Sequence, residues 1–319
     1  MILHNDIERF PTLIKFTAEH FKILPAFIEK DYWITRSLQR LSQNPNKEKV
    51  VFKGGTSLAK AYRLTNRFSE DIDIAVIDAN SFSGNQLKML IKRLAKDMAS
   101  GLEENVVPHT TSKGSRFYRA LYKYPQIQEL SAVPINSGQI LIEINTYANP
   151  YPYIKQEITC FITDYLTTIN RLDLIEEYQM QPFVINVLDK RRTIVEKLVS
   201  LVRFSFSTDI TKALAGKIRH FYDLYYLVND SECAEYIKSD DFKSDLMELM
   251  RHDQQEFDEP QGWQTKAFAD SPLTKDFPVL WENVRFVYQT ELAQLSYGII
   301  PNEKLVMESF MNLMQIVEK

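Results

Sequence analysis

The spacing of apolar residues predicts alternating helices and strands in the first part of the chain. Residues 5–45 show helical spacing of apolar side chains and predict helices. The run VVF at 50–52 is bounded by glycines and predicts a short buried strand. Residues 57–62 predict the first turns of a helix, and DIDIAV at 71–76 alternates strictly, which is the period of a strand. A glycine pair therefore lies between a predicted strand and a predicted helix.

The same analysis extends the pattern to about residue 150. Residues 85–106 predict an amphipathic helix whose outer side is rich in Lys and Arg. RFYRALYKY at 116–124 and QILIEINTY at 139–147 predict the next two strands. The order strand, helix, strand, helix, strand, strand predicts an α+β fold with an α/β core and a mixed sheet.

The pattern changes after NPYPY at 149–153, which is typical of a boundary. From residue 157 onward the sequence predicts mainly helices, and the clearest are at 191–204, 214–228, 240–257 and 302–319. We therefore expect two domains. Residues 1–156 would form N-terminal helices and the sheet core, and residues 157–319 a large helical domain.

Composition supports a helix-rich globular protein. The 319 residues are 45% hydrophobic and 25% charged, and only nine are glycine. This glycine usage of about 3% is below the average of roughly 7%, so each glycine pair is informative. The net charge of −4 does not indicate a nucleic-acid-binding protein by itself, although it conceals any local basic surface.

Other sequence features exclude several classes. Cys160 and Cys233 lie far apart and do not form a zinc motif, so we interpret them as buried or incidental thiols. The N-terminal residues lack the apolar stretch of a secretory signal. No run of about 18 apolar residues indicates a membrane span. The expected localisation is cytoplasmic.

Gly54 and Gly55 predict a close backbone approach to a ligand. They follow a strand and precede a helix, whose first N–H groups and positive dipole end favour phosphate. Thr56 and Ser57 can cap that helix and offer hydroxyl groups. The alternative is a simple left-handed turn followed by a helix cap.

Asp71 and Asp73 predict a metal site. Residues i and i+2 of a strand point to the same face, and two neighbouring carboxylates repel unless a cation lies between them. Mg²⁺ binds through one or two carboxylates and substrate phosphates. Glu143, inside an apolar strand, could supply a third carboxylate. The alternatives are a solvated strand face for the aspartates and an exposed edge strand for Glu143.

These residues and several others resemble one known family. GGTSLAKAYRL and RFSEDIDIAV are similar to the first two motifs of the AbiEii/AbiGii toxins, which are nucleotidyltransferases of the DNA-polymerase-β-like superfamily. IEKDYWITRSL at 28–38 resembles the N-terminal helix of that family. RTIVEKLVSLVR, with Lys197, and KIRHFYDLYYL, with Asp223, resemble the third and fourth motifs.

The resemblance implies a polymerase-β-like mixed sheet and transfer of a nucleoside monophosphate (NMP) from an NTP with Mg²⁺ or Mn²⁺. It implies that Gly55 and Ser57 hold phosphates, that Gly54 and Thr56 shape the turn, and that Asp71 and Asp73 bind metal. Lys197 would lie near the phosphates, and Asp223 would be a catalytic or positioning carboxylate.

The implied partners are an RNA acceptor such as tRNA and a cognate antitoxin, since the family supplies toxins of type IV toxin–antitoxin pairs. Two other functions stay open at this point. One is a metal-dependent nuclease that uses Asp71, Asp73 and Glu143. The other is a non-catalytic member of the fold that binds a nucleotide or a protein partner.

Overall fold

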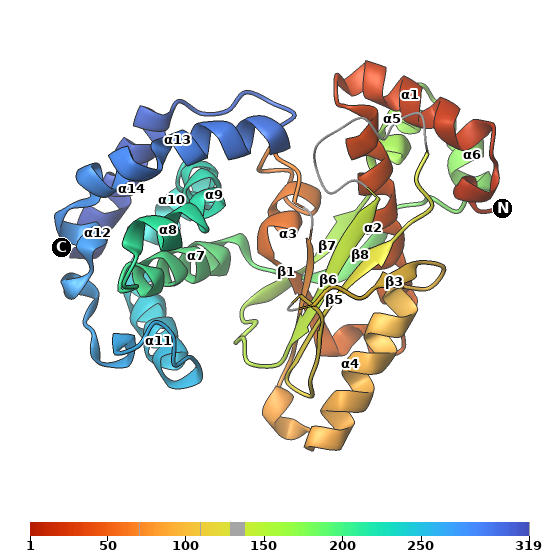
Figure 1. Cartoon of the computed structure of the whole chain (residues 1–319). Coiled ribbons are helices and arrows are strands. Elements are labelled where there is room, and N and C mark those ends of the chain that lie inside the picture. The colour runs from red at the N-terminus through yellow and green to blue at the C-terminus, as the bar shows by residue number, and fades with distance from the viewer. Residues whose placement is uncertain (70, 109, 128–137, 319) are drawn as a thin grey trace. The chain divides into compact units, whose positions relative to one another are not determined.

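The computed structural model describes residues 1–69, 71–108, 110–127 and 138–318. The chain forms two compact units. The first contains Met1–Arg63 and Phe68–Leu188, and the second contains Leu64–Arg67 and Asp189–Lys319. The first unit is a mixed sheet with helices (Figure 1), and the described part of the second consists of helices.

The sheet of the first unit has the strand order β3-β5-β6-β2-β1-β8-β7, with β4 paired to β5. The pairs β2–β6 and β1–β8 are parallel, and the other pairs are antiparallel. This mixed sheet confirms the predicted α+β fold class. The strands are β1 (Val50–Lys53), β2 (Asp71–Val76), β3 (Glu103–Asn105), β4 (Ser112–Lys113), β5 (Phe117–Lys123), β6 (Gln139–Asn145), β7 (Tyr153–Ile158) and β8 (Phe183–Leu188).

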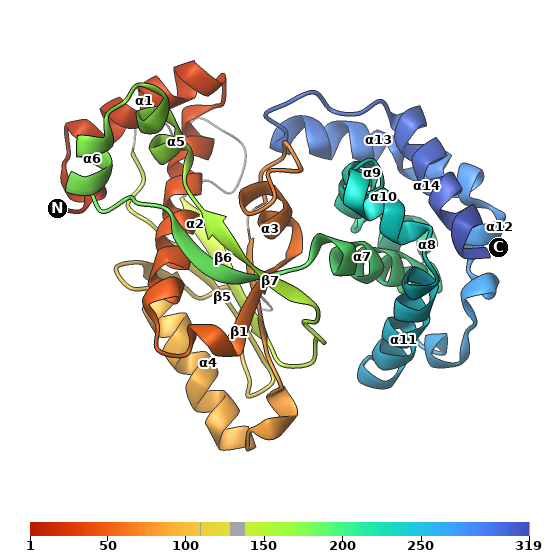
Figure 2. The same cartoon turned by 180° about the vertical axis from the view of Figure 1, so that it is seen from behind.

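Helices of the first unit pack against the sheet and against one another. The helices α2 and α4 contact each other and β6, and α1, α5 and α6 gather around one end of α2 (Figures 1 and 2). The bounds are α1 (Arg9–Phe21), α2 (Pro25–Gln43), α3 (Gly54–Lys60), α4 (Gly84–Met98), α5 (Phe161–Thr168) and α6 (Leu172–Glu177). Short 3₁₀ helices span Leu3–Asn5, Lys47–Lys49 and Ala79–Ser81.

Alternation along β2 separates an apolar face from a charged one. Ile72 and Ile74 are fully buried, whereas Asp71 and Asp73 are half-buried on the opposite face. The neighbouring β6 follows the same rule, with Ile142 and Ile144 buried on either side of the half-buried Glu143. Since α2 and α4 contact β6, they cover the apolar face. The carboxylates therefore occupy the other face of the sheet.

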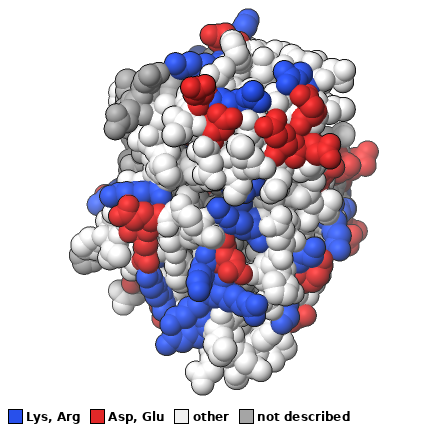
Figure 3. Space-filling view, turned by 90° about the vertical axis from the view of Figure 1, so that its right-hand side faces the viewer, with Lys and Arg blue, Asp and Glu red and all other residues white. Residues whose placement is uncertain are grey.

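Helix α4 has a basic outer side, as its sequence indicates. It begins with a capping box formed by Ser83 and Gln86 and buries five long apolar side chains, Leu87, Leu90, Ile91, Leu94 and Met98. Its exposed cations are Lys88, Lys92, Arg93 and Lys96. Figure 3 shows Lys and Arg gathered toward the bottom of this side of the molecule, where Figure 1 places α4. The helix ends before residue 106 because residues 103–105 form β3.

The second unit packs helices around α9. Its ring contacts join Phe221 of α9 to Phe277, Trp281 and Phe310, with centroids 5.0 to 5.6 Å from that of Phe221. The helices are α7 (Lys190–Phe204), α8 (Ile210–Ala215), α9 (Ile218–Val228), α10 (Ser231–Ile237), α11 (Asp240–Glu256), α12 (Pro272–Lys275), α13 (Phe277–Leu295) and α14 (Glu303–Glu318). Two 3₁₀ helices span Trp263–Thr265 and Phe268–Asp270.

The first unit extends further along the chain than the sequence indicates. The expected boundary at 156–157 lies within β7, and the strand β8 follows two helices later. Because β8 pairs with both β1 and β7, residues up to Leu188 belong with the sheet. The expectation of a mainly helical region from residue 157 missed this strand.

No helix in the described ranges is long and apolar enough to cross a membrane. Cys160 and Cys233 are both buried and free.

A buried ion pair ties α2 to α3 inside the first unit. The Lys60 ammonium lies 2.5 Å from one carboxylate oxygen of Asp31, and both side chains are less than 10% exposed. The other oxygen of Asp31 accepts the N–H of Phe161 at 2.9 Å. Burial raises the pKa of Asp31 even with Lys60 beside it, so desolvation is the larger effect. The pair thus fixes the position of α3 at a cost in stability.

We predict that replacing only Lys60 destabilises the protein, and that replacing both Lys60 and Asp31 restores most of the lost stability. Lys60→Met leaves a buried carboxylate without its cation and should lower the free energy of unfolding by about 3–5 kcal/mol. Adding Asp31→Asn, which keeps an acceptor for the Phe161 N–H, should restore most of that loss. Urea unfolding of the two variants and the wild type measures this. Equal losses in the single and double variants would contradict it.

Candidate active site

The turn between β1 and α3 requires glycine at its first position. Gly54 has a φ of +80°, a left-handed conformation that other residues rarely adopt. A Cβ at this position would lie 2.1 Å from Oδ2 of Asp73. The carboxylate of Asp73 therefore packs directly on the glycine turn. The two motifs meet here, through residues that lie nineteen positions apart in the sequence.

Thr56 and Ser57 are part of the turn's internal structure. Both are buried, and their hydroxyls donate to backbone carbonyls, that of Thr56 to Asp71 and that of Ser57 to Gly54 at 2.8 Å. The sequence suggested that they cap the helix, but α3 already begins at Gly54 and its N-cap residue is Lys53. The Thr56 hydroxyl links α3 to the first residue of β2. Phosphate binding by Ser57 stays a prediction.

A row of four charged residues crosses the sheet at the level of Asp73. Asp73 is the register partner of Lys53 on β1 and of Glu143 on β6, and Glu143 is the partner of Arg119 on β5. The Nε of Arg119 lies 2.8 Å from Oε1 of Glu143. The structure thus brings the three predicted carboxylates onto one face of two adjacent strands. It also places a cation at each end of the row.

The donor set on this face is chemically suited to a hard divalent ion. Asp71 and Asp73 offer carboxylate oxygens from one face of one strand, and Mg²⁺ binds through one or two carboxylates plus phosphate oxygens. No group of three His, Cys, Asp or Glu in the described ranges comes together as a metal cluster. Two carboxylates on one strand face fit a metal ion that is also coordinated by substrate phosphates. Metal binding by Glu143 stays a prediction.

Lys197 and Asp223 come together in the second unit, with Arg67 as a third member. The Lys197 ammonium lies 2.7 Å from Oδ2 of Asp223. Arg67 donates to Asp223 in a bidentate pair, from Nε at 2.8 Å and from Nη2 at 2.6 Å. Asp223 is fully buried, and the other two side chains are 7% and 3% exposed. Their placement relative to the glycine turn stays a prediction.

The cations determine the charge state of Asp223. Burial alone would raise the pKa of this carboxyl, but Arg67 and Lys197 lower it well below the usual range. Burial and the neighbouring Lys197 also hold the pKa of His220 well below its ordinary value, so that imidazole is neutral. Asp223 is therefore an ionised positioning group and a poor general base at neutral pH.

Arg67 belongs to a segment of residues 64–67 that is bound to the second unit by its backbone. The carbonyl of Asn66 accepts the Tyr297 N–H at 3.0 Å and the Ser296 hydroxyl at 2.9 Å. Its N–H donates to the hydroxyl of Tyr222 at 3.2 Å. Since Arg67 precedes Asp71 by only four residues, the chain connects this anchored segment directly to the strand that bears the carboxylates.

Sequence reasoning did not identify Arg67 or Arg119 as part of these clusters. Arg67 could have been noticed as a cation inside the RFSEDID motif. Arg119 carried a weaker signal, since it is the charged member of an alternating strand, RFYRALYKY, like Glu143 in QILIEINTY. Neither pattern reveals its partner, because the pairs join residues far apart in the chain.

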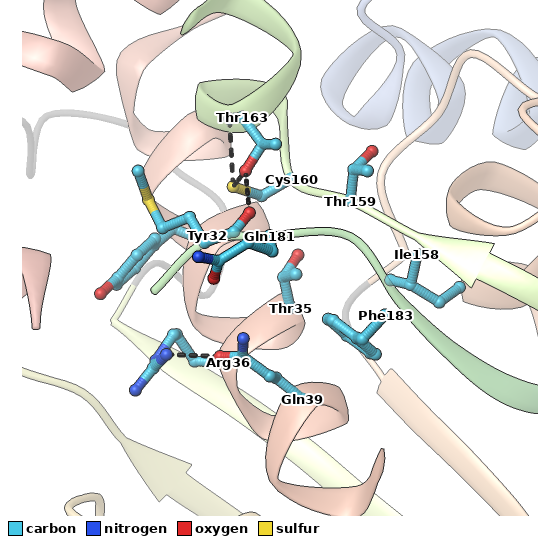
Figure 4. Close-up of a pocket in the computed structure, with 11 residues that line it drawn as sticks. Tyr32, Thr35, Arg36, Gln39, Ile158, Thr159, Cys160, Thr163, Gln181 and Phe183 are labelled. Atoms are coloured by element: carbon cyan, nitrogen blue, oxygen red, sulfur yellow. Dashed lines mark hydrogen bonds between the residues drawn. The ribbon is translucent and has the colours of Figure 1, made fainter. Parts of the chain in front are cut away.

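A separate pocket in the first unit is lined by none of the predicted site residues (Figure 4). It lies between α2, the start of α5 and the residues before β8. The Sγ of Cys160 accepts the Thr163 N–H at 3.4 Å, and the Thr163 hydroxyl donates to the carbonyl of Met180 at 2.9 Å. Burial raises the pKa of the Cys160 thiol, so it is not an activated nucleophile.

A mixed sheet in which a glycine turn packs against a strand carboxylate, Asp73, agrees with the nucleotidyltransferase class that the motifs indicated. The sequence profile of the family "Nucleotidyl transferase AbiEii toxin, Type IV TA system" matches residues 36–290. The chain belongs to this family of nucleotidyltransferase toxins, as its motifs indicated. The family places it among the toxins of type IV toxin–antitoxin systems, for which an antitoxin is the implied partner and an NTP the implied substrate.

The chain is also similar to the solved structure of MenT4, a nucleotidyltransferase toxin from Mycobacterium tuberculosis H37Rv, with 14% identity and a TM-score of 0.49. The alignment covers 95% of this chain and 98% of that one. No curated protein matches the sequence.

We predict that Gly54→Ala disrupts the site with little loss of the fold. The new Cβ would overlap Asp73 and force a positive φ on alanine, so stability should fall by about 1–3 kcal/mol. Nucleotidyl transfer should fall by about 100-fold or more, because a misplaced carboxylate costs that much. Gly84→Ala is the matched control, since nothing lies within 4 Å of its added Cβ. Equal activity of the two variants would contradict the prediction.

Proposed function

We propose that this chain transfers an NMP from an NTP to an RNA acceptor, of which tRNA is the first to test. The reaction would use Mg²⁺ or Mn²⁺ held by Asp71 and Asp73. The observation that supports this most is the packing of Asp73 on Gly54, because it puts a carboxylate beside the N-terminus of α3, whose first N–H groups have no acceptor within the helix. A nuclease has no triphosphate to hold, so the turn favours transfer.

Each of these residues would have a separate role in an in-line displacement at the α-phosphorus. The backbone N–H groups of Gly55 and Ser57 would hold triphosphate oxygens, and Lys197 would donate to another phosphate oxygen. Asp71 and Asp73 would hold the metal through their carboxylates. When bound there, the ion would act as a Lewis acid on the α-phosphate and stabilise the leaving pyrophosphate.

The bond changes follow from that arrangement. The acceptor hydroxyl oxygen forms a bond to the α-phosphorus while the α–β phosphoanhydride bond breaks, pyrophosphate leaves, and the hydroxyl proton passes to water. Asp223 would take no proton, since its pKa lies well below the usual range. We assign it the role of holding the Lys197 ammonium in place.

The acceptor proposal has its own support on α4. Lys88, Lys92, Arg93 and Lys96 are exposed and have no ion-pair partner within the described residues. The three lysines follow each other at i, i+4, an arrangement of like charges that destabilises a helix. A polyanionic backbone would relieve this repulsion. The basic side of α4 faces away from the sheet, so it would contribute affinity for RNA at a distance from the reacting groups.

Transfer by the wild type is the direct test. The protein is incubated with each α-labelled NTP, Mg²⁺ and total RNA, and label in RNA is measured. We expect labelling with at least one NTP, and Asp71→Asn or Asp73→Asn should lower its rate by about 100-fold or more, the upper range for disturbing a metal site. RNA shortening without NTP would instead support a nuclease. Absence of NTP binding in calorimetry would support a non-catalytic role.

RNA affinity tests the role of α4. Replacing its four exposed cations with Gln should weaken tRNA binding and reduce the slope of log K against log salt by about 2 to 3. The control variant replaces four exposed lysines of the second unit, Lys212, Lys238, Lys275 and Lys304, and so changes the net charge equally. Fluorescence anisotropy at several salt concentrations measures both. Equal slopes for the two variants would refute a role for α4.

A further inference from the structure

Arg119 occupies the same sheet face as the carboxylates. It lies on β5, directly opposite Glu143 on β6, which lies opposite Asp73 on β2. Register partners point to the same face, and adjacent strands are about 4.8 Å apart, so about 10 Å separate the backbone positions of Arg119 and Asp73. That span is within reach of an Arg side chain and a bound phosphate group together.

The guanidinium of Arg119 is only partly engaged. Its ion pair with Glu143 uses Nε at 2.8 Å, and this N–H makes no aligned hydrogen bond despite the short distance. The side chain of Arg119 makes no other hydrogen bond or ion pair with a residue that the structure describes. Its side chain is 41% exposed. The terminal nitrogens of Arg119 are therefore available to a ligand. The ion pair with Glu143 keeps this guanidinium on the same sheet face as Asp71 and Asp73.

The same ion pair changes the role expected of Glu143. A carboxylate neutralised by a guanidinium attracts a cation less strongly than one without such a partner. The charge of Glu143 is better matched to Arg119 than to a metal ion. Guanidinium groups, in turn, bind phosphate oxygens through paired N–H donors.

We propose that Arg119 binds a phosphate group of a substrate beside Asp73, and that Glu143 is the positioning residue for Arg119 and is not a metal ligand. This inference rests on the proposed nucleotidyl transfer. The phosphate belongs either to the triphosphate of the NTP or to the backbone of the acceptor RNA. Both present the same oxygens to a guanidinium.

The test separates metal binding from phosphate binding in purified full-length protein. Mn²⁺ affinity is measured by electron paramagnetic resonance for the wild type and for Asp73→Asn, Glu143→Gln and Arg119→Ala. We expect Asp73→Asn to weaken Mn²⁺ binding by about 10-fold or more. Glu143→Gln and Arg119→Ala should stay within about 3-fold of the wild type, which also shows that the site has folded.

Two binding experiments then identify which substrate supplies the phosphate. A non-hydrolysable NTP analogue is titrated by calorimetry with Mn²⁺ present, and tRNA is titrated by anisotropy without NTP. Arg119→Ala and Glu143→Gln should both weaken one of these by about 10-fold or more, the range of a charge-assisted hydrogen bond. Arg119→Lys should recover part of the loss. Lys123→Ala, an exposed cation four residues along β5, is the matched control.

Two results would overturn the inference. One is a loss of Mn²⁺ affinity in Glu143→Gln as large as that in Asp73→Asn, which would make Glu143 a metal ligand. The other is unchanged affinity of Arg119→Ala in both binding experiments. If the wild type transfers no nucleotide yet Arg119 governs phosphate binding, the proposed function fails and the binding role of Arg119 stands.

Discussion

The contact between Gly54 and Asp73 is the constraint on which the site depends. It demands a residue without a side chain, in a left-handed conformation, at the end of β1, and a carboxylate at one register position of β2. Antiparallel pairing of β1 and β2 satisfies both demands, since Lys53 and Asp73 are register partners. The hydrogen bond from Thr56 to the Asp71 carbonyl then joins the other side of the turn to the same strand. The turn and the carboxylates form one structural element.

Buried charges fix the positions of helices within each unit. In the first unit, Asp31 binds Lys60 of α3 and the backbone of Phe161. In the second unit, Asp223 binds both Arg67 and Lys197. Such pairs are expensive to desolvate, so they contribute little net stability. Their geometry is specific, however, and each joins a motif residue to a helix distant in sequence. We interpret them as determinants of position.

Sequence patterns correctly predicted the elements that depend on the spacing of neighbouring residues. DIDIAV predicted β2 and its two faces because one face is apolar and the other charged, and the glycine pair correctly marked the junction of β1 and α3. The strand FVINVL, which is β8, was missed, because a short apolar run buried in a sheet resembles a helix segment in its periodicity. Its identity depends on pairing with β1, more than a hundred residues earlier.

Side-chain partners were the other part that the sequence could not supply. The resemblance implied that Asp223 is a catalytic or positioning carboxylate, and helical spacing alone also allows an i, i+4 ion pair between Asp223 and Arg219. In the structure, Arg219 forms an ion pair with Glu291 instead, and Asp223 forms ion pairs with Arg67 and Lys197. Helical spacing is compatible with an Arg219–Asp223 pair and equally with its absence. Only the fold decides between them, because the competing cations arrive from other elements.

The cations that lie beside Asp223 and Glu143 distinguish these acidic residues, which sequence spacing alone does not separate from the other candidates. Asp223 is balanced by two cations and buried, so an added metal ion would face net positive charge there. Glu143 has one guanidinium partner at 2.8 Å, which reduces its attraction for a second cation. Asp71 and Asp73 share one strand face, where their mutual repulsion favours a cation between them. We therefore propose that the metal binds at the aspartate pair, where substrate phosphates would complete its coordination.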